Sequence, residues 1–240
     1  MNSRPFVVCH MVSSVDGKID GEWFASPEVR EPLAESNVIR ADYACKATLY
    51  GATTMAQTYA EGWVKELPVT ERHYSREDYI APSDVDSYFI AIDPKGEIAY
   101  DGKYIEKRGR AKVHVIEVLL ESVSDDYIAY LRSKDISYIF AGKDQLDPMM
   151  VMHKLNEFLH IDRLMICGGG IVDYTFLQAG LIDELSLVIV PLTDGGINVA
   201  TVFDRSPFVD PSEPVAFRLL EAKALSGSGV WLRYEPGNRS

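Results

Sequence analysis

The sequence predicts an α/β fold with a mixed, largely parallel sheet, and two observations support this. Short apolar runs alternate with segments whose apolar residues recur at helical spacing, a pattern typical of βαβ units. The last two apolar runs, 216–224 and 230–234, have only a Ser-Gly-Ser-Gly turn between them and predict a closing hairpin. The 240 residues contain no internal repeat and no linker, so we expect one domain over residues 1–240.

The first half of the chain predicts four strands and one long excursion. The strands are expected at 4–15, 47–55, 88–92 and 113–118, the second running into a turn and a helix. Ser26 followed by Pro27 predicts a helix start, and Pro32 is expected to split or delay that helix. The polar stretch 61–86 contains two prolines and predicts a surface excursion.

The second half of the chain predicts a more regular alternation of strands and helices. Helices are expected at 124–133, 148–159 and 171–179, the last ended by Gly180. Strands are expected at 136–141, 163–167 and 184–191, and a loop rich in Gly, Asp and Pro at 193–212.

Charge and composition restrict the partners of the protein. Lys and Arg number 24 and Asp and Glu 36, so the net charge is −12, which is unfavourable for binding nucleic acid or an anionic membrane surface. No signal-peptide pattern and no 18-residue apolar run are present. Cys9, Cys45 and Cys167 are far apart and predict structural thiols in a reducing, cytoplasmic environment.

Three consecutive glycines, Gly168 to Gly170, follow an apolar run and precede a helix-like pattern. A strand that ends in glycines opening a helix exposes backbone N–H groups at the helix N-terminus, where a pyrophosphate can bind without a lysine. The alternative is a tight strand-to-helix turn that only needs positive φ. The run is not GxGxxG and comes late in the chain, so a usual N-terminal Rossmann motif is not predicted.

Three motifs carry a resemblance to a known family. They are SSVDGK at 13–18, GEWFASPEVR at 21–30 and CGGGIVDYTFLQAGLIDELSLVIVP at 167–191. In this order and spacing the chain resembles the riboflavin-biosynthesis reductases of the RibD C-terminal domain type, which have a dihydrofolate-reductase-like fold. The resemblance extends over nearly the whole chain and is most specific in its last motif.

The resemblance implies a fold, a cofactor and a reaction. The fold is a three-layer α/β/α sandwich around a mixed, mostly parallel sheet. Members of the family bind NADPH and reduce the ribose ring of the small molecule 5-amino-6-(5-phosphoribosylamino)uracil, and many are homodimers. No HxE with PCxxC is present, so the zinc deaminase domain of bifunctional members is not expected here.

The resemblance also implies a set of cofactor-binding residues. The pyrophosphate would lie on the glycines and the first helical residues, and other family positions match residues in three earlier segments. The residues are Gly168, Gly169, Gly170, Ile171, Val172, Ser13, Trp23, Thr54, Thr58 and Pro94. Trp23 matches a tryptophan beside the nicotinamide, and Thr58 stands where the family often has aspartate.

The substrate side departs further from the family. Gly21 and Arg40 match or lie near substrate positions, and Asp16 either orients a substrate hydroxyl or stabilises its Asp-Gly turn. Cys167 stands where many members have a substrate-facing glutamate, and AQTYAEGW replaces the usual Asp-Asp-Pro at 56–63. No residue is assigned as a general acid.

Several other polar residues have structural interpretations. His153 and His160 are seven apart with no evident third ligand, so no metal site is expected. His10 and His114 lie in strands and are expected to be satisfied core or edge residues. Glu117, at the end of the predicted strand 113–118, is interpreted as standing just past the strand, where an acid can bond a ribose 2′-OH and favour NADH.

The sequence therefore predicts an NADPH-dependent reductase of the riboflavin type. One alternative is a dihydrofolate-reductase-like oxidoreductase acting on a pterin or a small carbonyl compound, which the departures at Cys167 and 56–63 favour. Another is a nucleotide-binding protein that does not catalyse a reaction.

Overall fold

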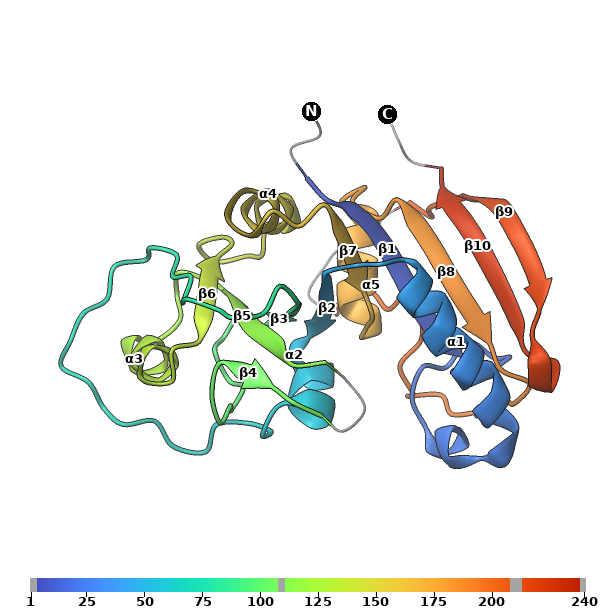
Figure 1. Cartoon of the computed structure of the whole chain (residues 1–240), viewed down its shortest axis with the longest axis horizontal. Helices are drawn as coiled ribbons and strands as arrows, with labels where there is room; N and C mark the ends of the chain where they lie inside the picture. Colours follow the sequence, from blue (N-terminus) through green and yellow to red (C-terminus); the bar gives the residue numbers. More distant parts are fainter. Residues whose placement is uncertain (1–3, 108–110, 208–212, 238–240) are drawn as a thin grey trace. The chain divides into compact units, whose positions relative to one another are not determined.

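The computed structural model describes residues 4–107, 111–207 and 213–237. The chain forms two compact units, which we call the mid-chain unit and the terminal unit. The mid-chain unit comprises Lys46–Asp162 together with the N-terminal residues up to Pro5, and the terminal unit comprises Phe6–Cys45 and Arg163–Ser240. Figure 1 shows the elements of both.

The terminal unit contains five strands in the order β7-β1-β8-β10-β9. Their bounds are Arg163–Ile166 for β7, Phe6–Ser13 for β1, Glu184–Ile189 for β8, Val230–Pro236 for β10 and Phe217–Ala224 for β9. β1 runs parallel to β7 and β8, and β10 runs antiparallel to β8 and β9. Helices α1 (Arg30–Asp42) and α5 (Gly170–Gln178) lie on opposite faces of these strands, which gives this unit its three layers (Figure 1).

The mid-chain unit contains the other five strands. They are β2 (Ala47–Gly51), β3 (Tyr88–Ile92), β4 (Tyr104–Ile105), β5 (Val113–Leu119) and β6 (Ser137–Phe140). β2, β3, β5 and β6 are joined by parallel pairs, and β4 pairs antiparallel with the first residues of β5. The helices are α2 (Ala52–Thr54), the π turn η3 (Met55–Tyr59), α3 (Asp125–Ser133) and α4 (Pro148–Leu159). The predicted α/β fold with a mixed, mostly parallel arrangement is confirmed.

Two helices, α3 and α4, start at side-chain caps, whereas α1 does not. Ser124 Oγ accepts the Tyr127 N–H at 3.2 Å at the start of α3, and Asp147 Oδ1 accepts two N–H groups at 3.0 Å at the start of α4. Ser26 makes no such bond, because the short 3-10 turns η1 (Glu22–Ala25) and η2 (Pro27–Val29) precede α1. Pro32 lies in the first turn of α1, where a missing N–H costs nothing, so the helix starts later than Ser26 predicted.

The observed connections agree with the predicted surface excursion at 61–86 and with the predicted closing hairpin. Residues 61–86 form no helix or named strand, and two isolated bridges, Trp63 with Ile98 and Tyr79 with Tyr138, attach them to the mid-chain unit. The short strand β4 was not predicted, because two residues are too few to show a periodic pattern. Of the predicted 193–212 loop, residues 208–212 lie outside the described part of the chain.

A buried polar network fixes α1 onto the sheet of the terminal unit. His10 on β1 lies 2.9 Å from both Ser36 Oγ on α1 and Ser186 Oγ on β8, and Trp231 donates to the same Ser186 oxygen at 2.9 Å. Burial lowers the pKa of His10 to about 4, so the ring is neutral and able to accept as well as donate. The interpretation of His10 as a satisfied core residue is confirmed.

The three cysteines form no disulfide. Cys9 is fully buried, whereas Cys45 and Cys167 are only half-buried, which corrects the expectation that all three are core thiols. Within the described residues, no helix is long and apolar enough to cross a bilayer.

Candidate functional site

The turn between β7 and α5 is the centre of the candidate site in the terminal unit. Gly168 has φ +87°, in the left-handed region, and its peptide bond to Gly169 is cis. Gly169 caps α5 with extended backbone, φ −77° and ψ 179°, and the helix begins at Gly170. The predicted strand–glycine–helix arrangement is therefore confirmed.

Backbone N–H groups are available at this end of α5. The N–H groups of Val172 and Asp173 already bond the Gly169 carbonyl oxygen, at 2.9 Å and 3.1 Å. In the described part of the chain, the structure gives no acceptor to the N–H groups of Gly169, Gly170 and Ile171. Unpaired N–H groups and the positive end of the helix dipole together form a site for a phosphate-type anion.

Two of the glycines are also required by the fold itself. Gly168 needs its left-handed backbone, and a Cβ there would lie 3.2 Å from the Met11 side chain. A Cβ on Gly170 would collide with the Thr201 carbonyl oxygen and lie 2.7 Å from Asp204 Oδ2. Glycine is therefore required at position 168 by the positive φ of the turn and at position 170 by packing. The extended backbone of Gly169 does not itself require glycine.

The loop 201–204 supports the turn from the side. The Asp204 N–H donates to the Gly170 carbonyl oxygen at 3.0 Å. The Asp204 carboxylate accepts the Thr201 N–H at 2.9 Å and the Thr201 hydroxyl at 2.6 Å. This contact was not predicted from the sequence, because residues 201–204 contain no local signal that they pack on the start of a helix more than 30 residues earlier in the chain.

Asp173 was also not predicted to take part in the site. Its side chain is fully buried in the first turn of α5, and its Oδ1 accepts the Gly168 N–H at 3.0 Å. Burial raises the pKa of Asp173 well above its ordinary value, the bond from Gly168 opposes that shift, and the neighbouring Asp204 charge adds to it. This raised pKa favours the uncharged form of the Asp173 carboxyl, which does not repel an anion.

Asp16 lies in the turn that follows β1, as part of a hydrogen-bonded loop. Its Oδ1 accepts the Ser14 hydroxyl at 2.6 Å and the Asp194 N–H at 3.1 Å, and its Oδ2 accepts the Gly195 N–H at 2.8 Å. These bonds, with Ser14 first, lower the pKa of Asp16 below its ordinary value. The geometry favours the turn-stabilising interpretation, because protein donors already occupy both oxygens.

Ser13, Gly21 and Trp23 lie near that loop. Ser13 is buried at the end of β1. A Cβ on Gly21 would collide with Asp194 Oδ2 and approach Trp23 Cδ1 to 2.8 Å, so packing alone explains this glycine. Trp23 is only 5% exposed, stacks on Phe24 at 3.8 Å between ring centroids, and donates its indole N–H to a backbone oxygen at 2.8 Å.

Arg40 and Cys167 complete the predicted substrate residues of the terminal unit. Arg40 is half-buried in the last turn of α1, and its charge adds to the burial that lowers the pKa of His10. Cys167 follows β7 directly and is half-buried, next to the glycine turn.

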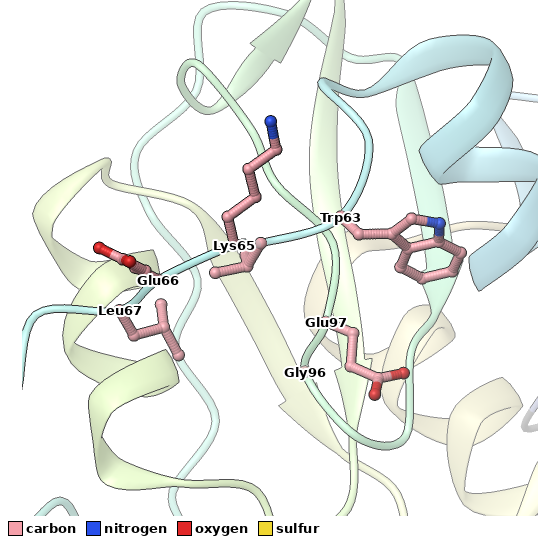
Figure 2. A pocket seen from close by; sticks show the side chains of 7 residues that line it. Trp63, Lys65, Glu66, Leu67, Gly96 and Glu97 are labelled. Atoms are coloured by element: carbon pink, nitrogen blue, oxygen red, sulfur yellow. The ribbon is translucent and has the colours of Figure 1, made fainter.

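The remaining predicted cofactor residues belong to the mid-chain unit. Thr54 ends α2 and is partly exposed, and Thr58 is exposed on the π turn. Pro94 lies in the turn after β3, closed by the Gly96 N–H on the Asp93 carbonyl oxygen at 3.1 Å, as predicted. Beyond this turn is an open pocket of about 360 Å³, lined by Trp63, Val64, Lys65, Glu66, Leu67, Gly96 and Glu97 (Figure 2).

Glu117 does not occupy the position that the sequence suggested. It lies inside β5 rather than beyond its end, is fully buried, and accepts a hydrogen bond from the Tyr100 hydroxyl. Burial and the nearby Asp93 raise the pKa of Glu117 well above its ordinary value. A buried acid bonded to a tyrosine cannot reach a ribose hydroxyl, so the sequence argument for NADH is wrong.

His114 is only partly satisfied, which corrects its interpretation as a satisfied residue. It is buried and its Nε2 lies 2.7 Å from Ser137 Oγ, but its Nδ1 has no hydrogen-bond partner within the described residues. His160 ends α4 in the left-handed conformation, φ 50°. The described residues contain no cluster of three potential metal ligands.

Comparison with known proteins identifies a family. The model of the RibD C-terminal domain family matches residues 5–230. A relative from Methanothermobacter thermautotrophicus, the 2,5-diamino-6-ribosylamino-4(3H)-pyrimidinone 5′-phosphate reductase, is 26% identical over 227 residues, which cover 92% of this chain and 94% of the relative. The protein of the same name from Archaeoglobus fulgidus is 23% identical over 211 residues, 86% of this chain and 89% of the relative.

Solved structures share the fold. A pyrimidine reductase-like protein from Corynebacterium diphtheriae superposes with a TM-score of 0.68 at 13% identity and covers 98% of this chain and 93% of its own. The riboflavin biosynthesis reductase of Saccharomyces cerevisiae superposes with a TM-score of 0.64 at 15% identity, with coverages of 99% and 92%. The predicted resemblance and the dihydrofolate-reductase-like fold are confirmed.

The contact between Gly170 and the 201–204 loop leads to a stability prediction. Gly170→Ala places a methyl group against Thr201 and Asp204, so we expect the free energy of unfolding to fall by about 1–3 kcal/mol, measured by urea denaturation. Gly102→Ala is the control, because a Cβ there has no neighbour within 4 Å, and its effect should stay below about 1 kcal/mol. Equal stabilities of the two variants would contradict the packing argument.

Proposed function

Because the chain belongs to the RibD C-terminal domain family, we propose that this oxidoreductase uses NADPH to reduce the ribose of a pyrimidine ribosylamine 5′-phosphate in riboflavin biosynthesis. The two curated relatives are named as reductases of such a compound. We further propose that the enzyme acts in the cytoplasm as a single domain over residues 1–240.

The N-terminus of α5 is the observation that carries the cofactor assignment. The N–H groups of Gly169, Gly170 and Ile171 lack acceptors within the described residues, and together they suit the pyrophosphate of a dinucleotide. Burial favours the uncharged form of Asp173 behind them, which adds no opposing charge. The protein has a net charge of −12, so a local device of this kind is needed to hold an anionic cofactor.

The cofactor would supply the hydride chemistry, and the protein would hold the cofactor and the acceptor in position. When bound, the nicotinamide would supply a hydride for the carbon of an open-chain imine, whose nitrogen would take up a proton. The chain's own contribution is to hold the phosphates at α5 and to orient the acceptor. Thr54, Thr58 and Pro94 of the mid-chain unit are proposed as further cofactor contacts, and Gly21, Arg40 and Cys167 of the terminal unit as substrate contacts.

The names of the relatives favour one substrate. They specify a 2,5-diaminopyrimidinone, which carries an amino group where the uracil has a second carbonyl oxygen. We propose this diamino compound as the acceptor and the aminouracil as the second candidate. Cys167 offers a thiol, a weak donor and acceptor, where many family members present a carboxylate.

We also propose a homodimer, as the family resemblance implies. The apolar strand β8 does not supply its contact surface, because β8 lies between β1 and β10 and both its edges are paired. β9 instead ends the strand order of the terminal unit. The side chains of Leu219 and Leu220 on β9 and Val230 on β10 are 51%, 41% and 38% exposed, which supports this hairpin as the contact surface.

Gly169→Val tests the cofactor site. Valine tolerates the extended backbone at this position, so the variant should fold, but its side chain would block the approach of the phosphates to the N–H groups. We expect NADPH binding, measured by fluorescence titration, to be abolished in Gly169→Val and retained in Gly102→Val. Unchanged affinity in a folded Gly169→Val protein would refute the site.

Steady-state turnover tests the substrate. We expect the wild type to oxidise NADPH with the diaminopyrimidinone ribosyl phosphate, and Cys167→Glu to lower KM by about ten- to a hundredfold, since a carboxylate adds charge-assisted bonds to the ring N–H groups. Cys167→Gln, of similar size and without charge, is the control.

Two other outcomes would point to the alternative functions. If neither the wild type nor Cys167→Glu turns over either pyrimidine while both bind NADPH, the substrate is another compound, such as a pterin or a small carbonyl. If no acceptor supports NADPH oxidation, the protein is a nucleotide-binding protein without catalysis.

Light scattering at micromolar concentration tests the oligomer. We expect a mass about twice the 26.8 kDa of one chain, because the exposed leucines of β9 gain free energy from burial. Leu219→Glu should reduce the mass to that of one chain, since it would bury charge in the interface. A wild-type mass near 26.8 kDa would contradict the dimer.

A further inference from the structure

We infer that Asp173 is a positioning residue of the dinucleotide site, whose carboxyl holds the glycine turn in the shape that keeps the first N–H groups of α5 open to phosphate. The inference rests on the proposed function and names a residue that the sequence motifs do not single out. It follows from the contacts of Asp173 with both sides of the turn.

The first contact fixes the backbone of the turn. Asp173 Oδ1 accepts the buried Gly168 N–H at 3.0 Å, while the Asp173 N–H bonds the Gly169 carbonyl oxygen at 3.1 Å. The same residue therefore holds the turn before and after its central peptide bond. Without the carboxyl, the Gly168 N–H would be buried with no acceptor, and the turn would have to move to satisfy it.

The second oxygen shows which form of the carboxyl the site accepts. Asp173 Oδ2 is buried and has no hydrogen-bond partner within the described residues. Within the described residues, the charges that act on Asp173 and on its neighbour Cys9 of β1 come from Asp204 in the 201–204 loop and from Cys167 after β7, and neither group is cationic. An ionised carboxylate here would be buried, unpaired and adjacent to another acid, so the neutral acid is the stable form.

A neutral acid serves a phosphate site better than a carboxylate. It supplies the acceptor that Gly168 requires without placing a negative charge behind the N–H groups that face the cofactor. Burial first, and then Asp204, raise the pKa of Asp173, so this carboxyl keeps its proton to a higher pH than an exposed aspartate and ionises as the pH rises further. On ionisation a charge of the same sign as the phosphates develops beside them, so cofactor affinity should fall at alkaline pH.

The inference is tested with Asp173→Asn and Asp173→Leu in the full-length protein. Asparagine keeps an acceptor oxygen for Gly168 and cannot ionise, whereas leucine keeps the approximate size and removes the acceptor. The matched control is Asp147→Leu, which removes the N-terminal cap of α4 in the mid-chain unit and so damages a helix start elsewhere. The NADPH dissociation constant is measured by fluorescence titration from neutral to alkaline pH, with melting temperatures recorded for every variant.

We expect Asp173→Asn to bind NADPH within about threefold of the wild type at neutral pH, and Asp173→Leu to bind at least about tenfold more weakly, the effect of one lost hydrogen bond and a displaced turn. The wild type should lose affinity at alkaline pH while Asp173→Asn does not. Cys9, Cys167 and Asp204 are present in both proteins, so this difference isolates Asp173. Asp147→Leu should lower the melting temperature without changing NADPH affinity.

Other results would overturn the inference. Wild-type affinity in a folded Asp173→Leu protein would show that the carboxyl does not position the turn, and identical pH profiles of the wild type and Asp173→Asn would show that its protonation does not matter. A wild type that fails to bind NADPH at any pH would instead refute the proposed function, and the role of Asp173 with it. The two failures are therefore distinguishable.

Discussion

The candidate site depends on how the first turn of α5 is held. Gly168 is bonded to Asp173 within the helix, and Gly170 is packed and bonded against the 201–204 loop. At both positions any side chain would displace the bonded backbone, which explains why both residues are glycine. Within the described residues, the N–H groups of Gly169, Gly170 and Ile171 have no acceptor, because the first turn of a helix offers them no intrahelical partner. The start of α5 is thus open to an anion while the bonds of Gly168 and Gly170 hold the turn in place.

The mid-chain unit also contains buried acids that act as hydrogen-bond acceptors. Glu117 is buried in β5 and bonded to Tyr100, with Asp93 nearby, and burial raises the pKa of both acids above their ordinary values. Asp93 nevertheless accepts the N–H groups of Glu97 and Ile98, at 2.7 Å and 3.0 Å, which shapes the turn containing Pro94. In both units, then, a buried acid serves as a hydrogen-bond acceptor that holds a turn after a strand.

Local patterns predicted most of the fold, because strands and helices depend on periodicity and capping within a few residues. The glycine run and its helix were predictable for the same reason. Asp173 was not, since an acid in a first helical turn is ordinarily an exposed partner of the helix dipole, and only the packing of the 201–204 loop and β1 buries it. Glu117 was interpreted as an exposed acid at a strand end although the predicted strand, 113–118, contains it, and β5 extends to Leu119 and buries its side chain.

The 61–86 excursion has a consequence for how this enzyme can diverge. It contributes no named strand, and besides its two isolated bridges it is held mainly by side-chain bonds. Among them, Arg76 bonds the Asp125 carboxylate at 2.6 Å at the start of α3, and Lys154 of α4 bonds the Asp78 carboxylate at 2.9 Å. A segment held by side-chain bonds and not by strand pairing can change in length and composition while the strand register stays intact. New specificities can therefore arise in this segment by insertion and deletion, a route that the tightly packed β7–α5 turn does not permit.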